Sequence, residues 1–142
     1  MLFAIISLFL LWIPGSNATP STLPSRDPVV VPGTIAAFAE KIQSEKSRTR
    51  RIELLGGLIT QVREQVAALP DSIDESETPR VEMLYELHIL LGQLKPDTLN
   101  PATCPNVLRA MRQMTNPNGL SENQLTSSGR LVLDVVKSVC AP

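Results

Sequence analysis

Aromatic residues are scarce in this sequence. Of its five aromatic side chains, Phe3, Phe9 and Trp12 lie in the N-terminal apolar run, which leaves Phe38 and Tyr85 for the rest of the chain. A core with so few rings has to be aliphatic, and stacking platforms for bases or sugar rings are essentially absent. The scarcity therefore argues against proteins that recognise nucleic acids or carbohydrates by stacking.

Histidine is even scarcer, with His88 as the single example. A Ser–His–Asp triad needs a histidine and an activated serine, and no serine here stands in a nucleophile-elbow pattern. His88 falls beside the apolar face of an expected helix, so we interpret it as an ordinary, partly buried residue. Glu82, Tyr85 and Glu86 fall mostly on the face of that helix expected to be solvated. We expect no catalysis, no cofactor and no metal site.

Neither sign of charge is in large excess, because the formal net charge is −1. Proteins that bind nucleic acid or anionic membranes usually carry a clear excess of Lys and Arg. A helix that spans a bilayer needs about 20 apolar residues, and no segment reaches that length. We therefore expect no nucleic-acid partner and no stable membrane span.

The N-terminal segment has the pattern of a cleavable secretory signal peptide. Residues 1–13 carry no charged side chain, Pro14 and Gly15 break the run, and small residues follow at 16–18. An apolar core of roughly 7–15 residues before such a site is typical of exported proteins, and a short uncleaved anchor is the alternative. We predict a signal peptide at 1–18, a mature chain that begins at Thr19, and a secreted, extracellular location.

The segment that follows the predicted cleavage site, residues 19–33, is rich in Pro, Ser and Thr. Prolines recur at every fourth position from Pro20 to Pro32. Proline removes a backbone donor and biases its predecessor to extended geometry, so we expect an extended arm here.

The chain contains two cysteines, Cys104 and Cys140. In an exported protein an even pair predicts a disulfide, with an intermolecular bridge or free thiols as the alternatives. Two cysteines and one histidine do not provide the four ligands of a structural zinc site.

Apolar residues at spacings of three and four predict the first two helical regions. One begins with Thr34 as its cap and ends at Pro70, either as one long helix with an exposed middle or as two helices that meet near 45–50. Gly56 and Gly57 weaken this region or permit the close approach of a neighbour. After an acidic loop at 71–77, Thr78–Pro79 begins the next helix, which ends at Lys95–Pro96.

Two shorter helices complete the domain. The first follows Cys104–Pro105 and ends before the turn at 116–119, and a capping box of Ser121 and Gln124 begins the second, which continues to Cys140. Residues 131–139 are rich in β-branched side chains, but their spacing favours a helix over a strand. Antiparallel pairing of these two helices would bring the cysteines together.

The expected fold is therefore all-α. It is a small bundle of four or five helices over residues 34–142, with an extended Pro-rich N-terminal arm and one disulfide.

A short basic segment is the most distinctive local motif of the sequence. It comprises Lys46, Arg48, Arg50 and Arg51. The run 48–51 matches the pattern that dibasic-directed secretory proteases cut, and it partly resembles the host-entry motifs of some exported pathogen effectors. The interpretation that we favour is a charged, solvent-facing turn or a patch that binds a partner, such as an anionic glycan.

A leader, a Pro-rich arm and about four short helices resemble the layout of small helical cytokines, a likeness that assigns no residue roles. We expect a secreted interaction protein that binds another macromolecule, most simply an extracellular or cell-surface protein. The alternative is an extracellular carrier of a lipid or other small apolar ligand, with Met83, Met111, Met114 and Gly56–Gly57 lining its cavity. The oligomeric state is left open.

Overall fold

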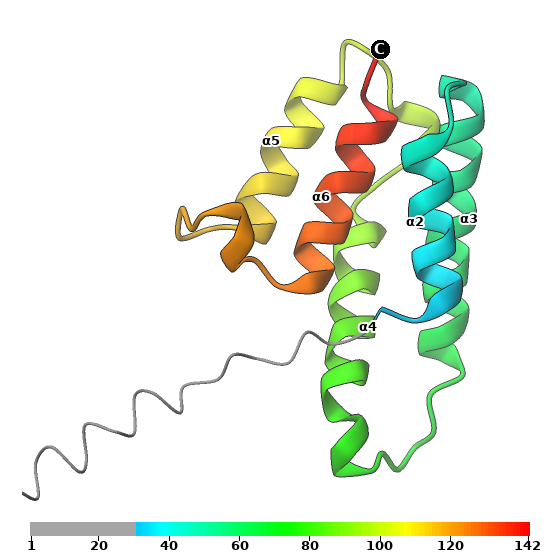
Figure 1. The fold of residues 1–142 in the computed structure, drawn as a ribbon, viewed down its shortest axis with the longest axis vertical. Coiled ribbons are helices and arrows are strands. Elements are labelled where there is room, and N and C mark those ends of the chain that lie inside the picture. Colours follow the sequence, from blue (N-terminus) through cyan, green and yellow to red (C-terminus); the bar gives the residue numbers. More distant parts are fainter. Residues whose placement is uncertain (1–30) are drawn as a thin grey trace, which may run out of the picture.

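The computed structural model describes residues 31–142, and every α-helix within them belongs to one bundle (Figure 1). The α-helices are α2 (Gly33–Ser44), α3 (Arg48–Ala67), α4 (Thr78–Gly92), α5 (Cys104–Thr115) and α6 (Ser127–Val139). Short 3₁₀ turns occur at η2 (Glu75–Glu77), η3 (Pro96–Thr98) and η4 (Glu122–Gln124). The predicted all-α bundle is confirmed. The predicted signal peptide at 1–18 and the arm at 19–33, except for its last three residues, lie outside the described residues.

The region between Thr34 and Pro70 forms two helices rather than one. The chain leaves helical geometry after Ser44, and the Ser47 hydroxyl then caps α3 by accepting a hydrogen bond from the backbone N–H of Arg50 at 3.3 Å. The predicted cap at Thr34 is wrong, because α2 begins at Gly33 without a side-chain cap. The Thr34 hydroxyl instead accepts a hydrogen bond from Gln65 of α3 at 2.7 Å.

Gly57 allows α2 and α3 to pack closely. A Cβ atom placed at Gly57 would lie 2.7 Å from Cε1 of the Phe38 ring in α2, whereas one placed at Gly56 would meet nothing within 4 Å. Of the two explanations for the glycine pair, close approach therefore applies to Gly57.

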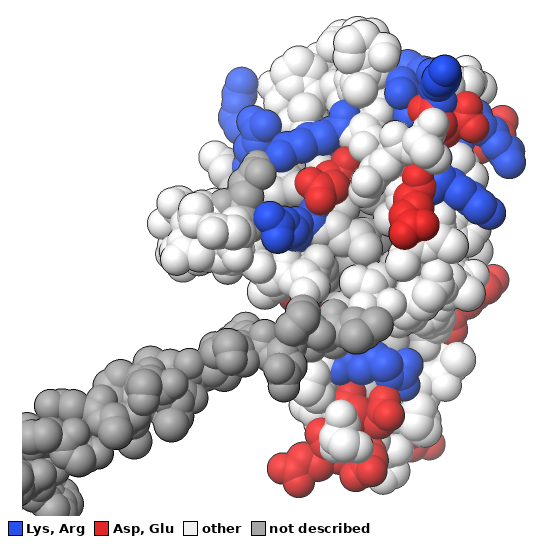
Figure 2. Space-filling model, in the orientation of Figure 1, with Lys and Arg blue, Asp and Glu red and all other residues white. Residues whose placement is uncertain are grey.

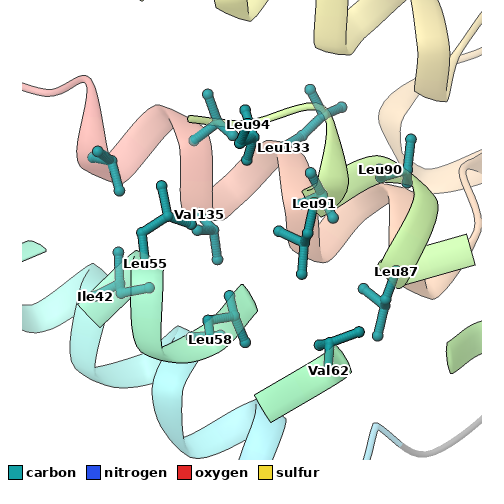
Figure 3. Close-up of a cluster of buried hydrophobic side chains, with 14 of the residues drawn as sticks. Ile42, Leu55, Leu58, Val62, Leu87, Leu90, Leu91, Leu94, Leu133 and Val135 are labelled. Atoms are coloured by element: carbon teal, nitrogen blue, oxygen red, sulfur yellow. The ribbon is translucent and has the colours of Figure 1, made fainter. Parts of the chain in front are cut away.

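Helix α6 is the central helix of the bundle, in contact with α2, α3, α4 and α5 (Figure 1). Its residues Val132, Val135, Val136 and Val139 are fully buried. This position explains the β-branched composition: the helix is surrounded by other helices, and burial outweighs the slightly lower helix propensity of valine. Figure 3 shows the aliphatic cluster to which these helices contribute, including Ile42 of α2, Leu58 of α3, Leu87 of α4 and Val135 of α6.

The disulfide is confirmed as a bridge within the chain. Cys104 is the first residue of α5 and Cys140 directly follows α6, and their Cα atoms are 5.7 Å apart. The two helices form an antiparallel pair, as predicted, so the bridge closes the end of the pair opposite its connecting loop.

The start of α6 differs from the prediction. The backbone N–H of Ser121 does donate to the Gln124 side chain at 3.2 Å, but this interaction closes only the short turn η4. Helix α6 begins at Ser127, after Thr126, whose hydroxyl accepts a hydrogen bond from the N–H of Gly129 at 3.1 Å. The Ser121–Gln124 spacing therefore marks a turn rather than the start of the helix. No helix in the described part of the chain is long and apolar enough to cross a membrane.

Candidate interaction surfaces

The basic segment lies where α2 gives way to α3, and its cations have different surroundings. Lys46 and Arg50 are exposed, and Arg50 pairs with Glu53 of the same helix at 2.8 Å. Arg48 is half-buried, with Nη2 3.8 Å from the disulfide sulfur of Cys104. The segment is therefore not one continuous solvent-facing patch.

Arg51 is buried, with 7% of its surface exposed. Its Nη2 donates to the carbonyl oxygen of Ala141 at 2.9 Å and its Nη1 to that of Glu45 at 3.4 Å, while its Nε has no hydrogen-bond partner. Arg51 thus joins the C-terminal residues to the turn between α2 and α3. The Arg51–Ile52 bond lies within α3, so a protease would have to unwind the first turn of this helix to cut there.

His88 is half-buried on α4, as the sequence predicts. Within residues 31–142, no group of three or more His, Cys, Asp or Glu side chains has an arrangement that could hold a metal ion.

A more distinctive surface lies between α4 and the C-terminal end of α5. Three large apolar side chains are exposed there: Tyr85 at 47%, Ile89 at 58% and Met114 at 42%. They belong to a surface hollow of about 530 Å³, which we call the α4–α5 hollow. Its lining residues are Glu82, Tyr85, Glu86, Ile89, Leu90 and Met114.

Helical spacing explains why α4 contributes most of this lining. Residues 82, 85, 86 and 89 follow one another at intervals that place them on one face of a helix, beside the stripe that faces the core. The prediction that Tyr85 faces solvent is confirmed. The sequence reasoning missed that Ile89 shares this face one turn later, although its spacing of four from Tyr85 was a usable signal. Met114 joins them from α5 in the tertiary structure, where α4 and α5 both pack against α6.

The rim of the α4–α5 hollow is anionic. Glu82 is exposed, and Glu86 is half-buried and held in place because its Oε1 accepts a hydrogen bond from the Thr126 hydroxyl at 2.7 Å. Residues 71–86 contain six carboxylates and one arginine, and Arg80 pairs with Glu77 at 2.7 Å. Figure 2 shows this acidic end of the molecule at the bottom, where the chain enters α4.

A second hollow, of about 480 Å³, lies between α5 and the segment that leads into α6. Its cations are Arg109 and Arg112, and its apolar side chains include Leu108 and Leu125. Lys and Arg side chains accordingly gather over α5 in Figure 2, away from the acidic end of α4.

Comparisons with protein-family models, with curated proteins and with solved structures found no match for this chain.

Proposed function

We propose that this protein is exported and acts by binding another macromolecule, without catalysing a reaction. The observation that supports the proposal is the α4–α5 hollow. Scattered apolar residues are normal on protein surfaces, whereas apolar side chains that gather at a concave surface are typical of binding sites. Tyr85, Ile89 and Met114 meet at one hollow, while most large aliphatic side chains of the described region pack in the core.

Export is supported by two independent features. The apolar run and small residues at 1–18 have the signal-peptide pattern. The Cys104–Cys140 disulfide is compatible with an extracellular location, since disulfides persist mainly in oxidising compartments. The partner is accordingly an extracellular or cell-surface protein.

Binding of the labelled mature protein to intact cells of the producing organism or its host tests this function. We expect binding that saturates, that unlabelled protein displaces, and that protease treatment of the cells removes. Ile89→Ser should weaken it, because Ile89 contributes to the floor of the hollow. The matched control is Ile73→Ser, since Ile73 is also exposed, at 38%, but lies outside the hollow. Non-saturable binding, or equal effects of the two variants, would contradict the proposal.

The alternative function, an extracellular carrier, draws support from the volume and apolar lining of the same hollow, which suit a small ligand. The other features that suggested a carrier have packing roles: Met83 and Met111 are buried in the core, and the Phe38 ring occupies the space beside Gly57. Native mass spectrometry separates the two functions. A co-purifying apolar small molecule would favour the carrier, and an unliganded mass the interaction protein.

A further inference from the structure

The α4–α5 hollow combines an apolar floor with an anionic rim, and this combination restricts what it binds. We propose that its ligand is an amphipathic helix of a partner protein whose apolar side chains are flanked by Lys or Arg. The inference rests on the proposed function and adds the chemistry of the partner.

The floor suits the apolar side chains of a helix. Tyr85 and Ile89 lie one turn apart on α4, and the buried Leu90 and the exposed Met114 of α5 line the same hollow. A groove between two helices accepts anchors that recur every three or four residues along a docking helix. The flexible Met114 side chain adapts to such anchors, and the rigid Tyr85 ring loses little entropy on binding.

The rim selects the charge of the partner. Glu82 and Glu86 lie at the hollow, and the carboxylates at 71–77 precede them at the start of α4. A fatty-acid carboxylate or an anionic lipid headgroup would meet like charges here, which disfavours binding. Lys or Arg on the docking helix would instead meet opposite charges. Because Glu82 and the carboxylates at 71–77 are exposed, added salt should weaken the attraction.

A second copy of the chain fits less well. The cations of the second hollow, Arg109 and Arg112, line a concave surface rather than a protruding ridge. Two concave surfaces do not fill each other, so the occupant is a different protein.

Tyr85 makes the hollow directly observable. It is the single tyrosine of the chain, and the single tryptophan, Trp12, lies in the predicted signal peptide. The ultraviolet emission of the mature protein therefore comes from the hollow. The probe is a synthetic amphipathic peptide of Leu and Lys in helical period, and the control peptide has Glu in place of Lys. We expect a saturable change in Tyr85 emission with the Lys peptide, weaker at higher salt, and none with the Glu peptide.

Two pairs of variants test whether the peptide binds at the hollow, because each pair compares a change at the hollow with the same kind of change elsewhere. Ile89→Ser should weaken binding of the Lys peptide about tenfold, as loss of an interface anchor does, whereas Ile73→Ser should leave it unchanged. Glu82→Lys should weaken it several-fold, and Glu40→Lys, the same charge change on the exposed face of α2, should have little effect.

Three results would overturn the inference. They are equal binding of both peptides, equal effects within either pair of variants, and a concentration-dependent change in Tyr85 emission without peptide that coincides with dimerisation in sedimentation. If the Lys peptide fails while Ile89→Ser still removes cell binding, the partner chemistry is wrong and the proposed function stands. If Ile89→Ser and Ile73→Ser do not differ in cell binding, the proposed function fails as well.

Discussion

At the residue scale, Gly56 and Gly57 are neighbours in α3 with different surroundings. Alanine is favoured over glycine in a helix by about 1 kcal/mol, so Gly56→Ala, which meets open space, should raise the free energy of unfolding by about that amount. Gly57→Ala should be less stable than Gly56→Ala by about 1–3 kcal/mol, because the added methyl displaces the Phe38 ring. Urea unfolding followed by circular dichroism measures both, and equal stabilities would contradict the close packing at Gly57.

Arg51 and Arg50 offer a second comparison at this scale. Arg51→Met removes two hydrogen bonds to backbone carbonyls from a buried site, and we expect a loss of about 1–3 kcal/mol in the free energy of unfolding. Arg50→Met breaks one exposed ion pair with Glu53 and should cost no more than about 0.5 kcal/mol. Urea unfolding again gives both values. Similar losses would mean that Arg51 does not hold the C-terminal residues in place.

At the element scale, the beginning of α6 depends on Thr126. Its hydroxyl caps the helix and also donates to Glu86 of α4, so Thr126→Ala should lower the free energy of unfolding by about 1–2 kcal/mol. Ser121→Ala, which affects only the turn η4, should cost less than half of that. Thermal unfolding in calorimetry ranks the two variants. A larger loss of stability in Ser121→Ala would contradict the role of Thr126 as the cap of α6.

At the scale of the whole molecule, the disulfide joins positions that are 36 residues apart. Closing a loop of that length restricts the unfolded chain and contributes about 4 kcal/mol to stability. Cys104→Ala combined with Cys140→Ala should therefore lower the free energy of unfolding by about that amount, measured against the oxidised protein in urea. A reduced wild-type chain should match the double variant. Unchanged stability on reduction would show that the helices alone hold this end of the bundle.

The mature form is a second prediction at this scale. Intact mass of the natural extracellular product should correspond to a chain that begins at Thr19, less the two hydrogens lost on forming the disulfide. A chain that begins at Met1 would contradict the cleavable signal peptide. A chain that begins at Ile52 would show that the backbone is cut after Arg51, which separates α2 covalently from the rest of the bundle.

Local pattern was sufficient for much of the fold. Spacings of three and four placed the helices, Thr78–Pro79 began α4, and the cysteine pair predicted the bridge that the structure contains. These features depend on interactions within a few residues, or on the few partners that two cysteines allow. The end of α2 and the start of α6 could not be placed as well, because several Ser and Thr residues could each act as a cap.

The sequence by itself determined that this chain is helical, has an aliphatic core and carries a signal-peptide pattern, because composition and periodicity express those properties directly. Only the tertiary structure decided that Arg51 is buried while Arg50 is exposed, that Gly57 receives the Phe38 ring, and that Met114 joins Tyr85 and Ile89. The physical reason is the same in each case. Whether a side chain is buried depends on neighbours that are distant in sequence. The periodicity of apolar residues within one helix does not predict those neighbours.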